Sequence, residues 1–182
     1  MNRSRMLVTL LLGLLFAFSA WAQEPVGIFK AAKEGDLATV KQYLASGATV
    51  NDLDRYQYTP LHLAAEGGQA EVAAYLIENG ALVNALTQDG FTPLHSCALH
   101  GNAETATLLL KHGASVFLRD NNQMSPLHLC GLYNNFAVAE VLLANGADIN
   151  DKTTTEWTPL RVAQYAKATD MINFLTAHGA KE

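Results

Sequence analysis

Three equally spaced histidines are the first candidates for chemistry, since a neutral imidazole can bind a metal or act as a general base. They are His62, His95 and His128. Residues repeated at a constant step fall on successive packed units, and packed helices lie about 8–10 Å apart. One metal ion with bonds of about 2 Å cannot collect ligands from such a ladder. We therefore expect each histidine to bond to the backbone and to a neighbouring hydroxyl.

The other histidines and the two cysteines carry weaker signals. His112 and His178 stand just before glycines where helices should end, and a cationic group suits that end of a helix. His100 should be exposed and open to a contact. Cys97 and Cys130 are separated by the same step as the histidines. Export would permit a disulfide, but Cα atoms one helix spacing apart exceed the limit of about 7 Å, so we expect two buried, reduced thiols.

No catalytic motif accompanies these residues. The sequence lacks Gly-x-Ser-x-Gly, Cys-x-x-Cys, His-Glu-x-x-His and a phosphate-binding glycine loop. Its acidic residues are scattered, and the sequence forces none of them into a pair. We therefore expect no catalytic residue, no metal and no cofactor, and a protein that is not an enzyme.

A repeated tetrad indicates which elements position these side chains. Thr-Pro-Leu-His begins at Thr59 and Thr92, returns with serine at Ser125, and ends in arginine where it begins at Thr158. Gly-Ala pairs keep the same step along the chain. A fixed period of this length predicts stacked units of local structure and not one globular core. The pairs begin at Gly47, Gly80, Gly113, Gly146 and Gly179.

The structure of one unit follows from its residues. Thr59 is a good N-cap and Pro60 suits the first position of a helix. This short helix should stop at the glycine pair 67–68. A second, amphipathic helix is expected over 70–79, closed by a glycine in the left-handed conformation. Residues 82–90 are too polar and too rich in turn formers for a third helix, so they should project as a loop or hairpin.

These features resemble the ankyrin repeat family. The resemblance rests on the tetrads, on Ala64-Ala65 after the first of them, on the pair Glu71-Val72, and on the Gly-Ala-x-x-Asn endings. It implies an all-α solenoid of about five stacked helix-turn-helix repeats with projecting loops or hairpins, in a single domain over residues 23–182. The first repeat lacks the tetrad, and the last forms a polar cap. The expected repeats cover about 25–57, 58–90, 91–123, 124–156 and 157–182.

Four positions depart from the glycines of this pattern. Gln57, Gln123 and Glu156 stand where Gly90 alone keeps the usual loop glycine. We therefore expect those three loops to differ in shape from a consensus hairpin. Asn134 replaces the glycine that ends the first helix of its repeat, and asparagine is the next best residue for a left-handed turn.

The residue before each tetrad is always large and apolar, and in ankyrin proteins this position lies where the loop meets the concave face. Equivalent residues of a solenoid form columns, so these should form an apolar strip with nearby aromatic residues. Two interpretations stay open: the side chains pack together and stiffen the stack, or they remain partly exposed and bind a partner. The candidate binding residues are Tyr56, Tyr58, Phe91, Leu99, His100, Met124, Leu132, Tyr133, Trp157 and Tyr165. The candidate selectivity residues on the loops are Asp54, Arg55, Arg119, Asp120 and Glu156.

Residues 1–22 have the features of a secretory signal peptide. Two arginines precede an apolar run over 6–18, and Ala20-Trp21-Ala22 fits the cleavage rule. The run is shorter than the roughly 20 residues that span a bilayer, which argues against a membrane anchor. We expect cleavage after Ala22 and a mature chain that starts at Gln23, in the periplasm of a Gram-negative bacterium or secreted.

The charge balance limits the partner. The chain has 12 Lys and Arg against 17 Asp and Glu, and removal of Arg3 and Arg5 with the signal leaves 10 against 17, a net charge of −7. Nucleic acids and anionic membranes need a basic surface, so we expect neither as partner. We expect a monomer that binds an envelope or periplasmic protein through its concave face, as an inhibitor or immunity protein of an enzyme or toxin. The alternatives are an assembly or stabilising factor for a periplasmic enzyme, such as an oxidative-stress enzyme, and a small-ligand binder.

Overall fold

The computed structural model describes residues 27–181, which contain ten helices and, within that range, no strand. The helices come in five pairs, each with a first and a second helix joined by a tight turn. The first helices are α2 (Ile28–Glu34), α4 (Pro60–Gly67), α6 (Pro93–His100), α8 (Pro126–Tyr133) and α10 (Pro159–Ala166). The second helices are α3 (Leu37–Ala45), α5 (Ala70–Glu78), α7 (Ala103–Lys111), α9 (Phe136–Ala144) and α11 (Thr169–Ala177).

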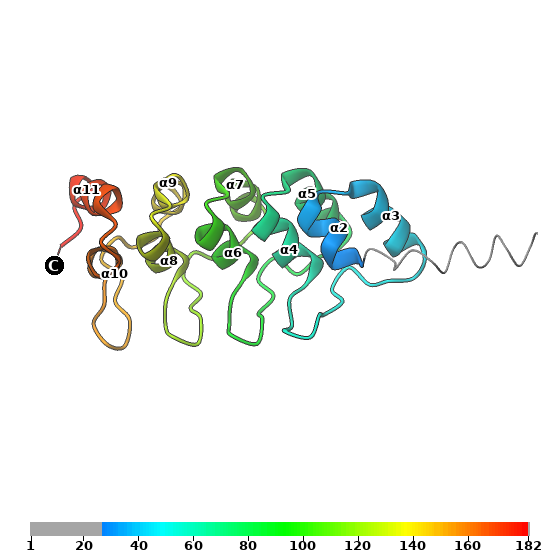
Figure 1. Ribbon diagram of the computed structural model, residues 1–182, viewed down its shortest axis with the longest axis horizontal. Coiled ribbons are helices and arrows are strands. Elements are labelled where there is room, and N and C mark those ends of the chain that lie inside the picture. Colours follow the sequence, from blue (N-terminus) through cyan, green and yellow to red (C-terminus); the bar gives the residue numbers. More distant parts are fainter. Residues whose placement is uncertain (1–26, 182) are drawn as a thin grey trace, which may run out of the picture.

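The pairs form an elongated stack of two helical rows. First helices pack on first helices and second helices on second helices, and the loops between repeats project from the side of the first row (Figure 1). We call the surface formed by the loops and the first helices the concave face. The predicted all-α solenoid is confirmed, and the signal-peptide prediction falls outside the described residues. Within those residues, no helix combines the length and apolar character that a membrane crossing requires.

The helix ends agree with the residues that predicted them. The Thr59 side chain accepts from the backbone N–H of His62, and proline fills the first helical position in four of the first helices. Every first helix ends at a left-handed residue, which is Asn134 in α8 and Lys167 in α10. The predicted left-handed turn at Asn134 is confirmed, with φ of 61°.

The core lies between the two rows of helices. Each tetrad leucine is buried, and so is a leucine from the facing second helix, while small residues after the tetrads let neighbouring first helices approach closely. The buried tetrad leucines are Leu61, Leu94, Leu127 and Leu160, and those of the second helices are Leu76, Leu109, Leu142 and Leu175.

The four loops share one backbone geometry, so the expected difference at the glycine replacements is wrong. Gln57, Gln123 and Glu156 adopt φ of 64°, 63° and 62°, in the same left-handed region as Gly90 at 80°. The backbone N–H of each bonds to the carbonyl of the third residue before it, as that of Gly90 does. The reason is that the turn is closed by hydrogen bonds on both sides of this residue, which outweigh the cost of about 1–2 kcal/mol for a left-handed side chain.

Relief of that strain gives a first prediction. Gln57→Gly combined with Gln123→Gly should raise the free energy of unfolding by about 1 kcal/mol, because glycine adopts positive φ without a Cβ clash but loses more chain entropy. Urea denaturation measures the change. Gly90→Gln in the second loop should lower stability by more than this amount, because the Cβ would add left-handed strain and would also lie 3.0 Å from the backbone nitrogen of Asn121; equal stability of all variants would contradict this account.

A second prediction concerns a buried hydroxyl in the second row. Thr105 of α7 is fully buried, and its Oγ1 is the one buried side-chain oxygen or nitrogen within residues 27–181 that lacks a hydrogen-bond partner. Valine occupies the equivalent positions Val72 and Val138. Thr105→Val keeps the shape and removes the unpaired group, so it should stabilise the protein by about 1–2 kcal/mol, measured as a higher urea midpoint. Thr107→Val, where the hydroxyl does donate to a backbone carbonyl, should give no such gain.

Candidate interaction surface

Each tetrad histidine connects its own repeat to the loop of the next. The Nδ1 atom of His62 accepts from the backbone N–H of Thr59 (3.1 Å) and lies 2.9 Å from the Thr59 hydroxyl. The Nε2–H group donates to the backbone carbonyl of Phe91, 3.0 Å away in the following loop. The same bond joins His95 to Met124 (3.2 Å) and His128 to Trp157 (3.0 Å).

Burial keeps these imidazoles neutral. All three rings are fully buried, and this burial lowers the pKa of His62 and of His95 to about 4 and shifts the pKa of His128 in the same direction. A neutral ring offers the one acceptor and one donor that the two backbone partners require. The predicted structural role of the histidines is therefore confirmed. No further repeat loop follows the last tetrad within the described residues, and there Arg161 is exposed, with its guanidinium 5.2 Å from the Trp157 ring centre.

Each loop also holds the residue before the tetrad from its other side. Two hydrogen bonds join the residue before the tetrad to the residue four positions earlier. The backbone N–H of the residue before the tetrad donates to a side-chain oxygen of the earlier residue, and the backbone N–H of the earlier residue donates to the carbonyl of the residue before the tetrad. The backbone of each of these four residues is thus fixed at both its N–H and its carbonyl. The pairs are Asp54 with Tyr58 (2.8 Å), Thr87 with Phe91 (3.1 Å), Asp120 with Met124 (2.8 Å) and Thr153 with Trp157 (3.1 Å).

The four side chains before the tetrads are half-buried, so neither of the two interpretations holds for them in full. The ring of Phe91 stacks on His95 at 5.6 Å between centroids and 3° between planes. Tyr58 meets His62 edge-on at 5.5 Å, and Trp157 meets Tyr165 edge-on at 5.4 Å. These contacts order the rings, while the part of each side chain that stays exposed can contact another molecule.

The other predicted binding residues lie where the first helices end and on the first loop. Leu99 and Leu132 are half-buried and His100 is exposed. Tyr133 is 51% exposed and Tyr165 is 73% exposed, although aromatic side chains of this size are usually covered in a folded domain. Tyr56 is 53% exposed at the tip of the first loop. The structure thus places at least partly accessible aromatic or aliphatic side chains in the first, third, fourth and fifth repeats.

Two of the predicted selectivity residues have internal roles. Asp120 is only 2% exposed, because its carboxylate accepts the backbone N–H groups of Asn122 and Met124 within the turn, so its assignment to partner selectivity is wrong. Arg119 forms an ion pair with Asp151 of the next loop. Asp54 accepts two backbone N–H groups in the same way as Asp120 but stays half-exposed. Arg55 and Glu156 are exposed, as expected for contact residues.

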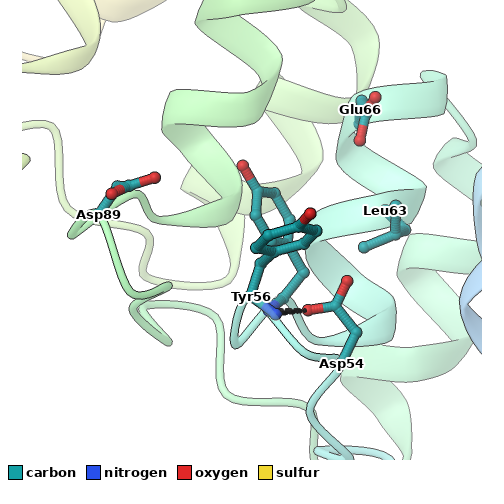
Figure 2. A pocket seen from close by; sticks show the side chains of 6 residues that line it. Asp54, Tyr56, Leu63, Glu66 and Asp89 are labelled. Atoms are coloured by element: carbon teal, nitrogen blue, oxygen red, sulfur yellow. Dashed lines mark hydrogen bonds between the residues drawn. The ribbon is translucent and has the colours of Figure 1, made fainter.

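A hollow of about 330 Å³ opens between the first loop, α4 and the tip of the second loop. Figure 2 shows Tyr56 near its middle, with Asp89 on one side and Leu63, Glu66 and Asp54 on the other. Tyr58 completes the lining, and burial, followed by the charges of Glu66, Asp89 and Asp54, raises the pKa of this tyrosine. The sequence predicted the two tyrosines and Asp54 as contact residues but not Glu66 or Asp89, which belong to other segments of the chain.

Phe117 is a further exposed aromatic residue, which the sequence patterns did not single out. It stands at the fifth position of a Gly-Ala-x-x-Asn ending and is 68% exposed. In the preceding repeat the asparagine at this position bridges to the next repeat: Asn84 donates to the carbonyl of Gly113 (3.0 Å) and accepts from the N–H of Ser115 (2.9 Å). Phenylalanine has no amide for these bonds. The sequence did contain a signal for Phe117: it is the one aromatic residue at a position that asparagine holds in the other complete endings.

The two thiols are buried and unpaired, as predicted. Cys97 and Cys130 are fully enclosed, and burial raises the pKa of each well above its ordinary range, so neither is a nucleophile. Within residues 27–181, no three histidine, cysteine or acidic side chains are grouped so as to hold a metal ion.

The fold and this surface define a helical repeat protein with side chains in register along one face. A family model described as ankyrin repeats (3 copies) matches residues 28–120 and again 83–153, which together include most of the chain. The chain belongs to the ankyrin repeat family. Comparison with curated proteins gives no match. Ankyrin repeats are generally modules for protein–protein interaction and are typically not enzymes, so a protein is the expected class of partner.

Proposed function

We propose that this ankyrin repeat protein is exported to the periplasm of a Gram-negative bacterium and binds one partner protein there through its concave face. The observation that supports this most directly is the row of strip residues. The four residues before the tetrads have their backbones held at both N–H and carbonyl and their side chains half-buried, and Tyr133 and Tyr165 nearby are more than half exposed. A preordered surface loses little entropy on binding, and exposed aromatic side chains commonly supply most of the binding energy.

Within this proposal the protein inhibits its partner, as an immunity protein does with a cell-envelope enzyme or toxin. Rigid docking suits inhibition because a preformed face can cover an active site without a folding step. The alternative, a factor that assembles or stabilises a periplasmic enzyme, uses the same face. The activity of the captured partner separates the two: inhibition predicts loss of that activity on addition of this protein, and assembly predicts retained or prolonged activity.

The export step has a direct test. The mature protein from the periplasmic fraction should begin at Gln23, as read by N-terminal sequencing or intact mass. A chain recovered from the cytoplasm with Met1 retained would contradict this part of the proposal.

The binding step gives a third prediction. Tyr133→Ala combined with Tyr165→Ala should weaken capture of the native partner from a periplasmic extract by about 100-fold or more, because two exposed aromatic anchors are lost. These residues suit the test better than Phe91, whose ring stacks on the buried His95, because both tyrosines are more than half exposed. Phe117→Ala is the matched control, since it removes an equally exposed ring outside the strip. Capture that survives the double substitution, or fails equally in the control, would overturn the proposal.

A further inference from the structure

The hollow beside the first loop differs in charge from the rest of the concave face. Three carboxylates surround its two tyrosine rings, from three separate segments: Asp54 in the first loop, Glu66 in α4 and Asp89 at the tip of the second loop. Such a mouth, with aromatic walls and negative charge, concentrates field lines and attracts cations.

The internal partners of these carboxylates leave negative charge in excess. Glu66 is bonded to Lys33, and its carboxylate lies 3.7 Å from Nε2 of His100. One oxygen of Asp54 accepts the N–H groups of Tyr56 and Tyr58, which leaves its second oxygen. The side chain of Asp89 is exposed at the rim. Three negative charges thus face two cations, Lys33 and the guanidinium of Arg55 beside Tyr56, which leaves one negative charge in excess.

An observation independent of the acids also points to a cation. The guanidinium of Arg55 already lies over the Tyr56 ring, 4.7 Å from its centre, although Arg55 is not among the residues that line the hollow. The Tyr56 ring thus already stacks with one planar cation, and because it is 53% exposed, a second cation can use its remaining open surface or displace Arg55. A guanidinium or ammonium group that enters the hollow would find tyrosine π-surface and carboxylates together, which is the combination that binds such groups best.

The second-to-last residues of the first helices form a column that indicates how a partner segment would lie along the face. The residue at this position is Lys33, then Glu66, Leu99, Leu132 and Tyr165 in successive repeats, so this column changes from charged to apolar toward the C-terminal end. The hollow in the second repeat and Trp157 in the fifth are three repeats apart. At about 8–10 Å for each repeat, that distance is roughly 30 Å, or about nine residues of extended chain.

We propose that this hollow is a binding site for a lysine or arginine side chain of the partner protein. The partner segment then lies in one direction, with its basic residue over the second repeat and apolar residues over the fourth and fifth. This inference deepens the proposed function, since it names the chemistry and the orientation of the segment that the concave face binds.

The site can be tested without the partner. N-acetyl-arginine methylamide is titrated into the 15N- and ring-labelled protein, and its neutral isostere, N-acetyl-citrulline methylamide, serves as the control ligand. We expect the ring signals of Tyr56 and Tyr58 to shift with a dissociation constant in the millimolar range for arginine and not for citrulline. Asp89→Asn should weaken this binding several-fold, and Asp170→Asn, with the same change in net charge on an exposed residue of α11, should not.

Several results would overturn the proposal. Equal shifts with citrulline would show that charge plays no part, and shifts produced by calcium chloride at lower concentration than by arginine would assign the hollow to a metal ion. With the captured partner, Asp89→Asn should lower affinity about tenfold at low salt and less at high salt. Unchanged affinity for Asp89→Asn, together with loss of capture for the Tyr133 and Tyr165 variant, would refute the basic-residue site while the proposed function stands.

Discussion

The protein should lose most of its stability between pH 6.5 and pH 4, through the buried tetrad histidines. In the folded chain the pKa of His62 and His95 is lowered to about 4 by burial, whereas in the unfolded chain both should titrate near 6.5. Below pH 6.5 the unfolded chain takes up protons that the folded chain cannot accept, so stability is complete above pH 6.5 and falls as the pH drops toward 4.

The size of this effect follows from the two shifts. A shift of about 2.5 pH units corresponds to about 3 kcal/mol for each histidine, so these two alone contribute on the order of 6 kcal/mol. Single domains have only about 5–15 kcal/mol in total, and His128 changes in the same direction. Protonation also removes the Nδ1 acceptor that binds the N–H of the tetrad, so the first helix and the following loop lose a shared partner.

Urea titrations at pH 7.5, 5.5 and 4.5 measure the loss. The variant with His62→Gln and His95→Gln should be less stable at neutral pH but should lose less stability on acidification, because an amide makes similar bonds and does not titrate. His112→Gln, at an exposed helix end, is the control and should keep the wild-type pH dependence. Equal urea midpoints for the wild-type protein at pH 7.5 and 4.5 would refute the role of the histidines.

A second large effect is expected at the contact between α8 and α10. A Cβ atom on Gly131 would lie 2.6 Å from the backbone carbonyl oxygen of Pro159, closer than van der Waals contact permits. The clashing atom belongs to the backbone at the start of α10, so it cannot turn aside like a side chain. Gly131→Val must therefore push the fifth repeat away from the fourth, and we expect a loss of about 3 kcal/mol.

Hydrogen exchange measures which helices lose stability in Gly131→Val. Amides of α10 and α11 should lose protection in Gly131→Val, while those of α4 to α7 stay close to the wild type, because each repeat contacts only its neighbours. The matched control is Gly27→Val: Gly27 also has a negative φ, and a Cβ there meets nothing within 4 Å. It should cost less than about 1 kcal/mol. A uniform change in protection along the chain would contradict the local clash.

The repeat period explains why so much of the fold could be predicted. Once residues one period apart fall into columns, the role of His62 implies those of His95 and His128, and the ladder geometry excludes a metal or a disulfide without any knowledge of side-chain positions. Helix ends follow from local residues such as Thr59 and Asn134, whose preferences act within one turn.

The exposure of the strip could not be predicted in the same way. Whether Phe91 lies open or stacked depends on its rotamer relative to His95, and the three segments that line the hollow meet only in the folded stack. The expectation at Gln57 is wrong because the column shows a missing glycine but not the hydrogen bonds that hold its turn. The clash expected at Gly131 could not be predicted from the sequence either, because alanine, which has a Cβ, stands at the same position of earlier repeats as Ala65 and Ala98.

Phe117 has a consequence for how the stack responds to ionic strength. Asparagine amides bridge the other junctions between repeats, at Asn51, Asn84 and Asn150, and neutral bonds of this kind change little with salt. The junction after Phe117 lacks this amide bridge; beside the bond from His95 to Met124, it has the ion pair between Arg119 and Asp151, whose charges dissolved ions screen. High salt should therefore weaken the junction between the third and fourth repeats slightly more than the junctions bridged by Asn84 and Asn150, and hydrogen exchange at high and low salt measures this difference.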